Sequence, residues 1–358
     1  MKLLIKIIIC SVLLLKTFSG YSQDTTVVAP PFISTAIDTS FYKNDSTPIK
    51  RTPITAHPVR KKSAMIATVS ILGFSGAMLE MWNQSENKSR GAWVAGGNIA
   101  AYGGMMVGLY NLWYKKYPQS KFHFFNDNKE WLQIDKVGHM YSSYTEGRVG
   151  MELWKWAGVP KNNAIWFGGL TGLAYQGIIE TLDGYSAEWG FSWGDMLANI
   201  AGSALLISQE LAWGEQRVQM RFSTHLEQYP NDAAHIRVKE LFGTKLPERV
   251  VKDYNAQSYW LAINYASFFK DKDHLPNWLP ISVGYGGQNM FGAFVNMGEA
   301  KGLKRYRQWY ISPDIDLTKI KTNSDLLNAL FFTMTLFHFP APAIEIANHK
   351  VKFHWFHL

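Results

Sequence analysis

The chain has 358 residues, of which 47% are hydrophobic and 15% aromatic, while only 18% are charged. This composition excludes an intrinsically disordered chain and a long coiled coil, which are poor in aromatic residues or rich in charged ones. The single cysteine excludes a disulfide framework, and the 36 Lys and Arg residues are scattered among 28 Asp and Glu residues without forming a nucleic-acid-binding stripe. Charged residues are scarcer than the roughly 25% of an ordinary soluble chain, so part of the surface is expected to meet lipid or a partner.

The N-terminus has the pattern of a secretory signal peptide over residues 1–22. Lys2 and Lys6 precede an apolar run that ends at Leu15, and small residues follow that run. Cys10 lies inside the run and not behind it, so no lipid is expected to be attached through this cysteine. An uncleaved anchor is the alternative interpretation. Residues 23–62 are rich in Thr, Ser and Pro and are expected to be a disordered linker.

Five apolar stretches of helical length follow between residues 63 and 214, and we expect them to form an apolar helical bundle. They cover residues 63–82, 91–114, 136–156, 162–182 and 193–213. The second stretch carries no charged residue and is long enough to cross a bilayer of about 30 Å. Glycines four residues apart, at 104 and 108 and at 168 and 172, are expected to let helix backbones approach closely.

The distribution of basic residues conflicts with ordinary threading through an inner membrane. If a signal peptide exports the chain, the basic residues at 60–62 and 115–121 fall on the outer side, where the positive-inside rule disfavours them. We therefore expect an exported protein of the periplasm or the outer membrane, with the inner membrane as the alternative.

Polar residues recur at helical spacing on three of these apolar stretches. Residues four apart share one helical face, and buried ionisable groups are costly unless they are paired. The three sets are therefore expected to face one another around a shared polar pocket. The first set begins just before the third stretch and consists of Asp135, His139, Ser142, Ser143 and Glu146. The second is Gln176, Glu180 and Asp183 in the fourth stretch, and the third is Asp195, Asn199, Gly202 and Gln209 or Glu210 in the fifth.

His139 is the candidate general acid or base, because a histidine oriented by a carboxylate is the usual proton carrier near neutral pH. Asp135 or Glu180 would orient it, and together these three are the candidate catalytic residues. The candidate ligand-binding residues are Lys136, Asp183, Asp195 and Asn199.

Two of these acids also have a purely structural interpretation. Asp135 is placed to be the N-cap of the third helix. Ser192 and Asp195 have the spacing of a capping box, with Asp in place of the usual Glu.

No established cofactor motif accompanies these residues. The sequence lacks the P-loop, the dinucleotide fingerprint, the zinc-protease helix and the serine-hydrolase elbow. One histidine with carboxylates does not have the spacing of an established metal motif, so neither a metal nor a cofactor is expected. Ser142 and Ser143 lie near His139 but are expected to be packing hydroxyls, not nucleophiles.

The order of these motifs resembles the YfiM-like family of predicted periplasmic lipoproteins, which carry the domain of unknown function numbered 2279. The resemblance rests on the segment 131–139, on Glu180 with Asp183 and Gly184, and on the segment 190–202. The arrangement Asp-Lys-x-x-His, an acid, then Asp-x-x-x-Asn-x-x-Gly is also similar to VanZ-like membrane proteins. The resemblance implies an envelope location and no known activity, and the chain departs from it by lacking a lipoprotein cysteine.

The C-terminal part changes in composition. Residues 215–256 are more charged and are expected to be a helical connector, with prolines 230 and 247 as breaks. Residues 259–266 alternate in polarity as a strand does, and 279–287, 305–317 and 351–356 are further expected strands. Residues 324–339 are an expected helix. The fold class is therefore α+β, mainly α, with a small antiparallel β-rich region over residues 257–358.

Three functions remain open from the sequence. The first is a non-enzymatic role in envelope maintenance or assembly, with the polar pocket in the helical bundle. The second is a membrane-proximal hydrolase or transferase that acts on a lipid-like or cell-wall substrate through His139. The third is a binding module whose aromatic C-terminal region contacts a protein partner. A membrane lipid or another envelope component is the expected partner, and nucleic acid is not.

Overall fold

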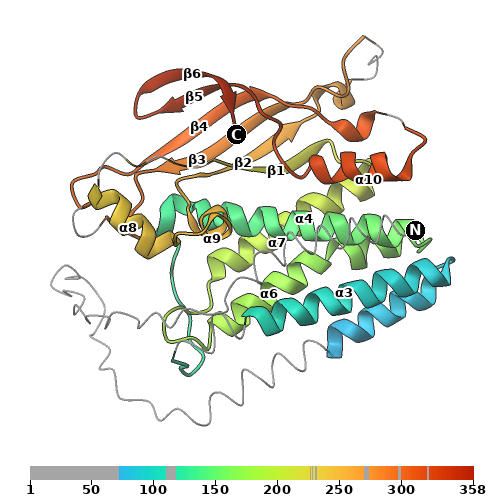
Figure 1. Ribbon diagram of the computed structural model, residues 1–358. Helices are drawn as coiled ribbons and strands as arrows, with labels where there is room; N and C mark the ends of the chain where they lie inside the picture. Colours follow the sequence, from blue (N-terminus) through green and yellow to red (C-terminus); the bar gives the residue numbers. More distant parts are fainter. Residues whose placement is uncertain are drawn as a thin grey trace.

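The computed structural model describes residues 72–109, 118–225, 227, 229, 232–269, 274–296, 300–320 and 322–358. The expected signal peptide and the expected linker lie outside these residues. Within them the chain is α+β, as predicted: helices dominate the first part, and an antiparallel sheet forms the last (Figure 1).

The helical part begins with a helix over residues 72–84. The longer helices that follow are α3 (Lys88–Leu109), α4 (Ile134–Trp156), α6 (Thr171–Asp183) and α7 (Trp193–Ala212). Among the described helices, none combines the length and the apolarity that crossing a membrane requires. The expected helix over 91–114 corresponds to α3, and residues 110–117 are outside the described part.

The predicted five-helix bundle is not confirmed as five uninterrupted helices. The fourth stretch is broken into the short helix α5 (Lys161–Asn163), a π-helical turn over Ala164–Gly168, and α6. The wider π-helical turn shifts the helix register before α6 begins. Most of the first stretch lies outside the described residues.

Helix α4 is the centre of the molecule and packs against α6 and α7 (Figure 1). Glycines make this close packing possible. A Cβ added at Gly172 of α6 would lie 2.1 Å from the carbonyl oxygen of Ser143, and one added at Gly202 of α7 would lie 2.2 Å from that of Met140. The close approach predicted at residues 168 and 172 is therefore confirmed, whereas a Cβ at Gly104 would meet nothing within 4 Å.

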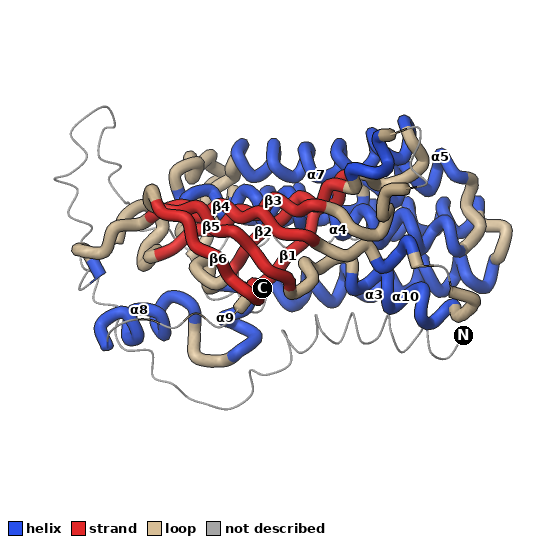
Figure 2. The backbone as a smooth tube through the Cα atoms, turned by 90° about the horizontal axis from the view of Figure 1, so that it is seen from above, coloured by secondary structure: helices blue, strands red, loops and turns tan. Residues whose placement is uncertain are grey.

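The sheet has six strands in sequence order, and every neighbouring pair is antiparallel. The strands are β1 (Val218–Thr224), β2 (Gln257–Ile263), β3 (Ile281–Gln288), β4 (Tyr306–Pro313), β5 (Ala341–Ala347) and β6 (Lys350–His357). Seen from above, the sheet lies over the α4 layer and α8 (Asp232–Phe242) and α9 (Leu246–Lys252) lie to one side (Figure 2).

Two strands differ from the sequence prediction. β1 lies inside the segment expected to be a helical connector, and β5 was not predicted as a strand. β1 pairs with β2 over its whole length, so long-range pairing decides its conformation over local charge. The strands predicted at 259–266, 279–287, 305–317 and 351–356 correspond to β2, β3, β4 and β6. The predicted helix over 324–339 is α10 (Asp325–Met334), capped by Ser324, whose Oγ accepts a hydrogen bond from the amide of Leu327.

Candidate functional site

The start of α4 positions the first candidate residues. Trp131, Leu132 and Gln133 have left-handed backbone angles, so the chain turns sharply before α4 begins at Ile134. Asp135 therefore stands in the first turn of the helix. The sequence prediction that Asp135 is the N-cap is wrong, because Gln133 occupies that position. Because Asp135 caps nothing, its carboxylate is available to side chains, and it accepts a hydrogen bond from Tyr254 Oη at 3.1 Å.

Polar side chains from four parts of the chain meet at this end of α4. We call this group the polar cluster. It consists of Asp127 from the preceding loop, Asp135, Lys136 and His139 from α4, Glu180 from α6, and Ser192, Asp195 and Asn199 from the start of α7.

Lys136 is the cation of the polar cluster. Its Nζ lies 2.7 Å from an oxygen of Asp127, 2.7 Å from one of Asp195 and 3.2 Å from one of Asp135. Burial alone would lower the pKa of Lys136, but the surrounding carboxylates outweigh burial and raise it. Burial would likewise raise the pKa of Asp127, but hydrogen bonds within the cluster lower it. Lys136 and Asp127 are thus a charged pair, and the positive charge of Lys136 also offsets the cost of burying Asp135 and Asp195.

His139 is held by one ring nitrogen and presents the other to two acids. Its Nδ1 lies 3.2 Å from Asn199 Oδ1, and an amide oxygen accepts, so Nδ1 carries the proton in this contact. Its Nε2 lies 3.7 Å from Glu180 Oε1 and 3.9 Å from Asp195 Oδ1. The side chain of His139 is 17% exposed, so it is half-buried in the cluster.

Glu180 and Asp195 face His139 as weak acids. Burial, together with the carboxylates of Asp195 and Asp183, raises the pKa of Glu180 to about 9. Burial and the carboxylate of Asp135 raise the pKa of Asp195 to about 8. Both acids are therefore largely protonated near neutral pH, next to a histidine nitrogen that can accept a proton.

The expected capping box is only half formed at the start of α7. Ser192 Oγ accepts from the amide of Asp195 at 3.1 Å, as predicted. The amide of Ser192, however, donates to Glu180 Oε2 at 3.1 Å and not to Asp195. Glu180 replaces the second half of the box, which leaves the carboxylate of Asp195 free to contact Lys136.

The expected shared pocket is smaller than the sequence stripes suggested. On α4, Glu146 accepts from Gln176 at 3.1 Å, and farther along Glu210 contacts Lys155 at 2.9 Å. These pairs lie one turn or more beyond His139 on a helix that rises about 1.5 Å per residue, so they cannot join the cluster. Asp183 acts on this region through its negative charge, which helps to raise the pKa of Glu180.

Sequence reasoning missed two residues of this region. Asp127 lies in a loop, where no helical spacing connects it with α4, and Tyr254 comes from the segment expected to be a helical connector. The polar turn before Trp131, with Asp127 and Glu130, gives no indication of its own that Asp127 reaches α4. Glu130 stands in the same turn, and burial with the nearby Asp127 raises its pKa to about 7.

Three ligand atoms of the polar cluster also fit a cation. Asp135, His139 and Asp195 each present one such atom, and these atoms lie within 4.8 Å of one another. The fold thus brings together three possible ligands whose spacing along the chain is not that of a known metal motif.

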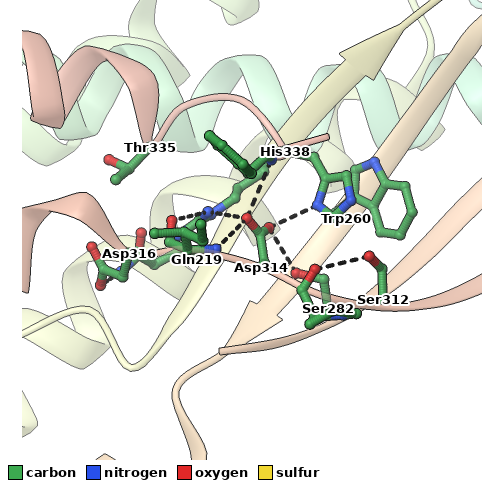
Figure 3. A network of polar contacts seen from close by, with 12 residues as sticks. Gln219, Trp260, Ser282, Ser312, Asp314, Asp316, Thr335 and His338 are labelled. Carbon is green, nitrogen blue, oxygen red and sulfur yellow. Dashed lines mark hydrogen bonds and ion pairs between the residues drawn. The ribbon is translucent and has the colours of Figure 1, made fainter. Parts of the chain in front are cut away.

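A second buried polar network links β1 and β3 with the segments that follow β4 and α10 (Figure 3). The carboxylate of Asp314 accepts from Arg221 Nη1 at 2.6 Å, from His338 Nδ1 at 2.7 Å and from Ser282 Oγ at 2.9 Å. Trp260 stacks on the imidazole of His338, with ring centroids 3.8 Å apart. Burial alone would raise the pKa of Asp314, but His338 and Arg221 lower it. The Arg221 side chain is 1% exposed and that of Asp314 is 0% exposed. Removing either partner would therefore leave a buried charge unpaired, which is strongly destabilising.

Comparison with known proteins gives one family. No curated protein and no solved structure matches the chain. Residues 123–209, less than half of the chain, match the family described as predicted periplasmic lipoprotein (DUF2279). This segment contains every member of the polar cluster, from Asp127 to Asn199. In the part that builds the polar cluster, the chain is therefore similar to a family of predicted periplasmic lipoproteins of unknown function.

Proposed function

We propose that the protein acts in the cell envelope and that the polar cluster is an acid–base centre for an envelope substrate. The envelope location is supported by the signal-peptide pattern, by the resemblance to YfiM-like and VanZ-like proteins, and by the match to a family of predicted periplasmic lipoproteins. The proposed place of action is the periplasm or the periplasmic side of the outer membrane.

The observation that carries the acid–base assignment is the position of His139 between Asn199 and two buried acids. Asn199 fixes the proton on Nδ1 and leaves the Nε2 lone pair facing Glu180 and Asp195. A base and a neutral acid within 4 Å of each other are the two partners that general acid–base catalysis needs. His139 would accept the proton of an attacking water or hydroxyl group, and Glu180 or Asp195 would give a proton to the leaving oxygen.

The substrate class follows from the location. A lipid-like or cell-wall substrate is cleaved or transferred at ester, phosphoester or glycosidic bonds, each of which needs proton transfer to oxygen. Lys136 and Asp135, whose side chains are 12% and 21% exposed, would hold polar groups of the substrate. A non-enzymatic role in envelope maintenance or assembly would use the same residues for binding alone.

The test is complementation of a deletion strain under envelope stress. We expect His139→Gln to fold like the wild type, because the side chain is partly exposed, and to fail to complement. His349→Asn is the matched control, since His349 stands in the exposed turn between β5 and β6, where its positive φ of 59° suits Asn. Full complementation by His139→Gln at wild-type protein levels would refute the acid–base assignment.

A divalent cation is a second candidate for the same centre. His139 Nε2 lies 4.0 Å from Asp135 Oδ1 and 3.9 Å from Asp195 Oδ1, too long for hydrogen bonds. Two atoms bound to one tetrahedral Zn²⁺ at about 2.1 Å lie about 3.4 Å apart, so these side chains would have to close by about half an ångström to share the ion. Titration calorimetry with Zn²⁺ and with Mn²⁺ distinguishes the candidates. Binding that Asp195→Asn abolishes supports the cation, and the absence of heat with either ion contradicts it.

A further inference from the structure

A cavity of about 560 Å³ is lined by residues of β3 to β6 and of the segment that follows β1. We call it the sheet cavity. Tyr306, Gln308 and Tyr310 alternate along β4 and line it, and Glu345 of β5 pairs with Tyr310 and lines it as well. Ligand pockets commonly enclose about 300–1,000 Å³, so the sheet cavity has the size of a site for a small molecule. None of its lining residues belongs to the polar cluster.

A β-bulge in β6 turns two histidines into the sheet cavity. His354 pairs with Ala343 and His357 pairs with Ala341, so three steps along β6 match two steps along β5. In a regular strand, side chains three positions apart point to opposite sides of the sheet. The extra residue of the bulge puts both histidines on the side of Glu345 instead, and both line the cavity. Bulges that re-aim a side chain are common next to functional sites.

Glu345 is a buried charge whose oxygens already have donors. It is 3% exposed, its Oε1 accepts from Gln308 Nε2 at 2.9 Å, and its Oε2 accepts from His354 Nε2 at 2.7 Å. Burial alone would raise the pKa of Glu345, but Gln308 and His354 lower it. The carboxylate is therefore charged near neutral pH and is stabilised from within the protein.

Glu227 has the same pair of donors but leaves two atoms of its partners unpaired. Its Oε1 accepts from Gln288 Nε2 at 2.6 Å, and its Oε2 accepts from His225 Nε2 at 2.7 Å. These contacts fix the orientation of the Gln288 amide and place a proton on Nε2 of His225. The amide oxygen of Gln288 and Nδ1 of His225 are buried, and neither has a hydrogen-bond partner among the described residues.

His357 adds a third buried atom without a partner. It is 9% exposed, and its ring stacks on that of Tyr310 with centroids 4.2 Å apart. Burial and the nearby His354 lower the pKa of His357 to about 4, so the ring is neutral near pH 7. Its Nε2 has no hydrogen-bond partner in the part of the chain that the structure describes. Buried polar atoms are costly to leave unpaired, so three of them on the residues of one cavity point to a ligand that completes their hydrogen bonds.

The charges of the sheet cavity favour a neutral ligand. An anion would meet the carboxylates of Glu227 and Glu345, and Lys352 is the one lysine or arginine among the described residues that line the cavity. A cation would find both carboxylates already paired with donors of the protein. For a metal ion, the single group of three acid or histidine ligand atoms within 4.8 Å of one another in the described residues is that of the polar cluster. The unpaired atoms of the cavity belong instead to an amide and two imidazoles, which bond well to hydroxyl groups.

Aromatic rings give the sheet cavity an apolar surface beside these polar atoms. Tyr306 lines it half-buried, and Phe356 lines it with 81% of its surface exposed. A sugar ring carries hydroxyl groups at its edge and C–H groups on its faces, so it forms hydrogen bonds in its plane and packs its faces against aromatic rings.

We propose that the sheet cavity binds a neutral mono- or disaccharide unit of a glycan. Phe356 packs against a face of the sugar, and Gln288 and His357 bond to its hydroxyl groups. This proposal does not depend on the acid–base assignment, because the sheet cavity and the polar cluster share no residue.

The test is titration calorimetry of the full chain with a panel of neutral disaccharides, namely N,N′-diacetylchitobiose, maltose, lactose and mannobiose. We expect at least one of them to bind with a Kd of about 1 mM or below. Phe356→Ala should weaken this binding about tenfold, since it removes the packing surface while the exposed position keeps the core intact. Phe353→Ala is the matched control, because Phe353 is also exposed on β6 but pairs with Ile344 on the other side of the sheet.

His357→Gln tests the unpaired nitrogen, and we expect it to weaken sugar binding while its circular dichroism stays that of the wild type. If this variant does not fold, Phe356→Ala still decides the question. The absence of heat with every sugar of the panel would overturn the proposal, and so would equal affinities of Phe356→Ala and Phe353→Ala. Zn²⁺ binding that His357→Gln abolishes and Asp195→Asn leaves intact would overturn it in favour of a metal ion.

Discussion

The contact between α4 and α7 gives the most direct test of how the fold builds the polar cluster. In Gly202→Ala, the new Cβ would lie 2.2 Å from the carbonyl oxygen of Met140 and 3.0 Å from the amide nitrogen of Tyr144. Both neighbours are backbone atoms and cannot rotate away. Relaxed contacts need about 3.5 Å, so α7 has to move by about 1 Å. Asn199 lies one turn earlier on α7, and such a movement stretches its 3.2 Å contact with His139.

The expected cost follows from two opposing terms. Forcing an extra carbon into a packed interface costs about 1–3 kcal/mol or more. Alanine recovers up to about 1 kcal/mol of helix propensity over glycine, so the net loss in the free energy of unfolding is about 1–2 kcal/mol. Equilibrium urea denaturation of the full chain measures it.

Gly104→Ala on α3 is the matched control. A Cβ there meets nothing within 4 Å, so the propensity gain should appear alone as a stabilisation of up to about 1 kcal/mol. The reasoning would be refuted if both substitutions stabilised the protein, or if Gly202→Ala lowered stability but left complementation intact.

Three further predictions concern the polar cluster and the buried sheet network. The pKa of Glu180 is raised in the folded state to about 9. The contribution of Glu180 to the free energy of unfolding is therefore fully present below the unfolded pKa and is lost as the pH rises through about 9, so stability should fall between pH 5 and 9. Glu180→Gln, which mimics the neutral acid, should flatten this dependence in thermal melts, and an unchanged slope would contradict the assignment. Asp314→Asn should lower the free energy of unfolding by about 3–5 kcal/mol in urea denaturation, since it leaves the buried Arg221 without its counter-charge. A loss below about 1 kcal/mol would show that this ion pair does not stabilise the fold. Ser192→Ala should cost about 1–2 kcal/mol in the same measurement through the lost cap of α7, and no change would show that the cap is dispensable.

Helical spacing predicted the centre of the polar cluster well. Asp135 and His139 share a face because α4 is regular there, and Asp195 and Asn199 share one on α7. Spacing says which residues of one helix act together. Because burying an unpaired ionisable group is costly, two such faces are predicted to contact each other. The structure brings these two faces together with Glu180.

The parts that were missed depend on contacts between distant segments. Asp127 joins the cluster from a loop and Tyr254 from a turn after α9, and neither has a periodicity that would reveal its partner. β1 alternates Val218, Met220 and Phe222 toward the α4 side, which was a usable strand signal, but the charge of the surrounding segment favoured a helix. Pairing with β2 overrides that local preference.

The sheet shows a different limit of periodicity. Alternation divides a strand into two faces, but it does not say which face is buried. In β4 the polar side is buried because Asp314 at its end binds Arg221, a residue 93 positions earlier that the sequence gives no reason to connect. The serines and Glu345 lie on the same buried side of the sheet as this pair. Ile311 and Ile346 alternate with them and therefore lie on the exposed side. The scarcity of charged residues, 18% of the chain, predicts exposed apolar residues somewhere on the surface but not where they lie. The long-range ion pair between Arg221 and Asp314 determines which face of the sheet is buried.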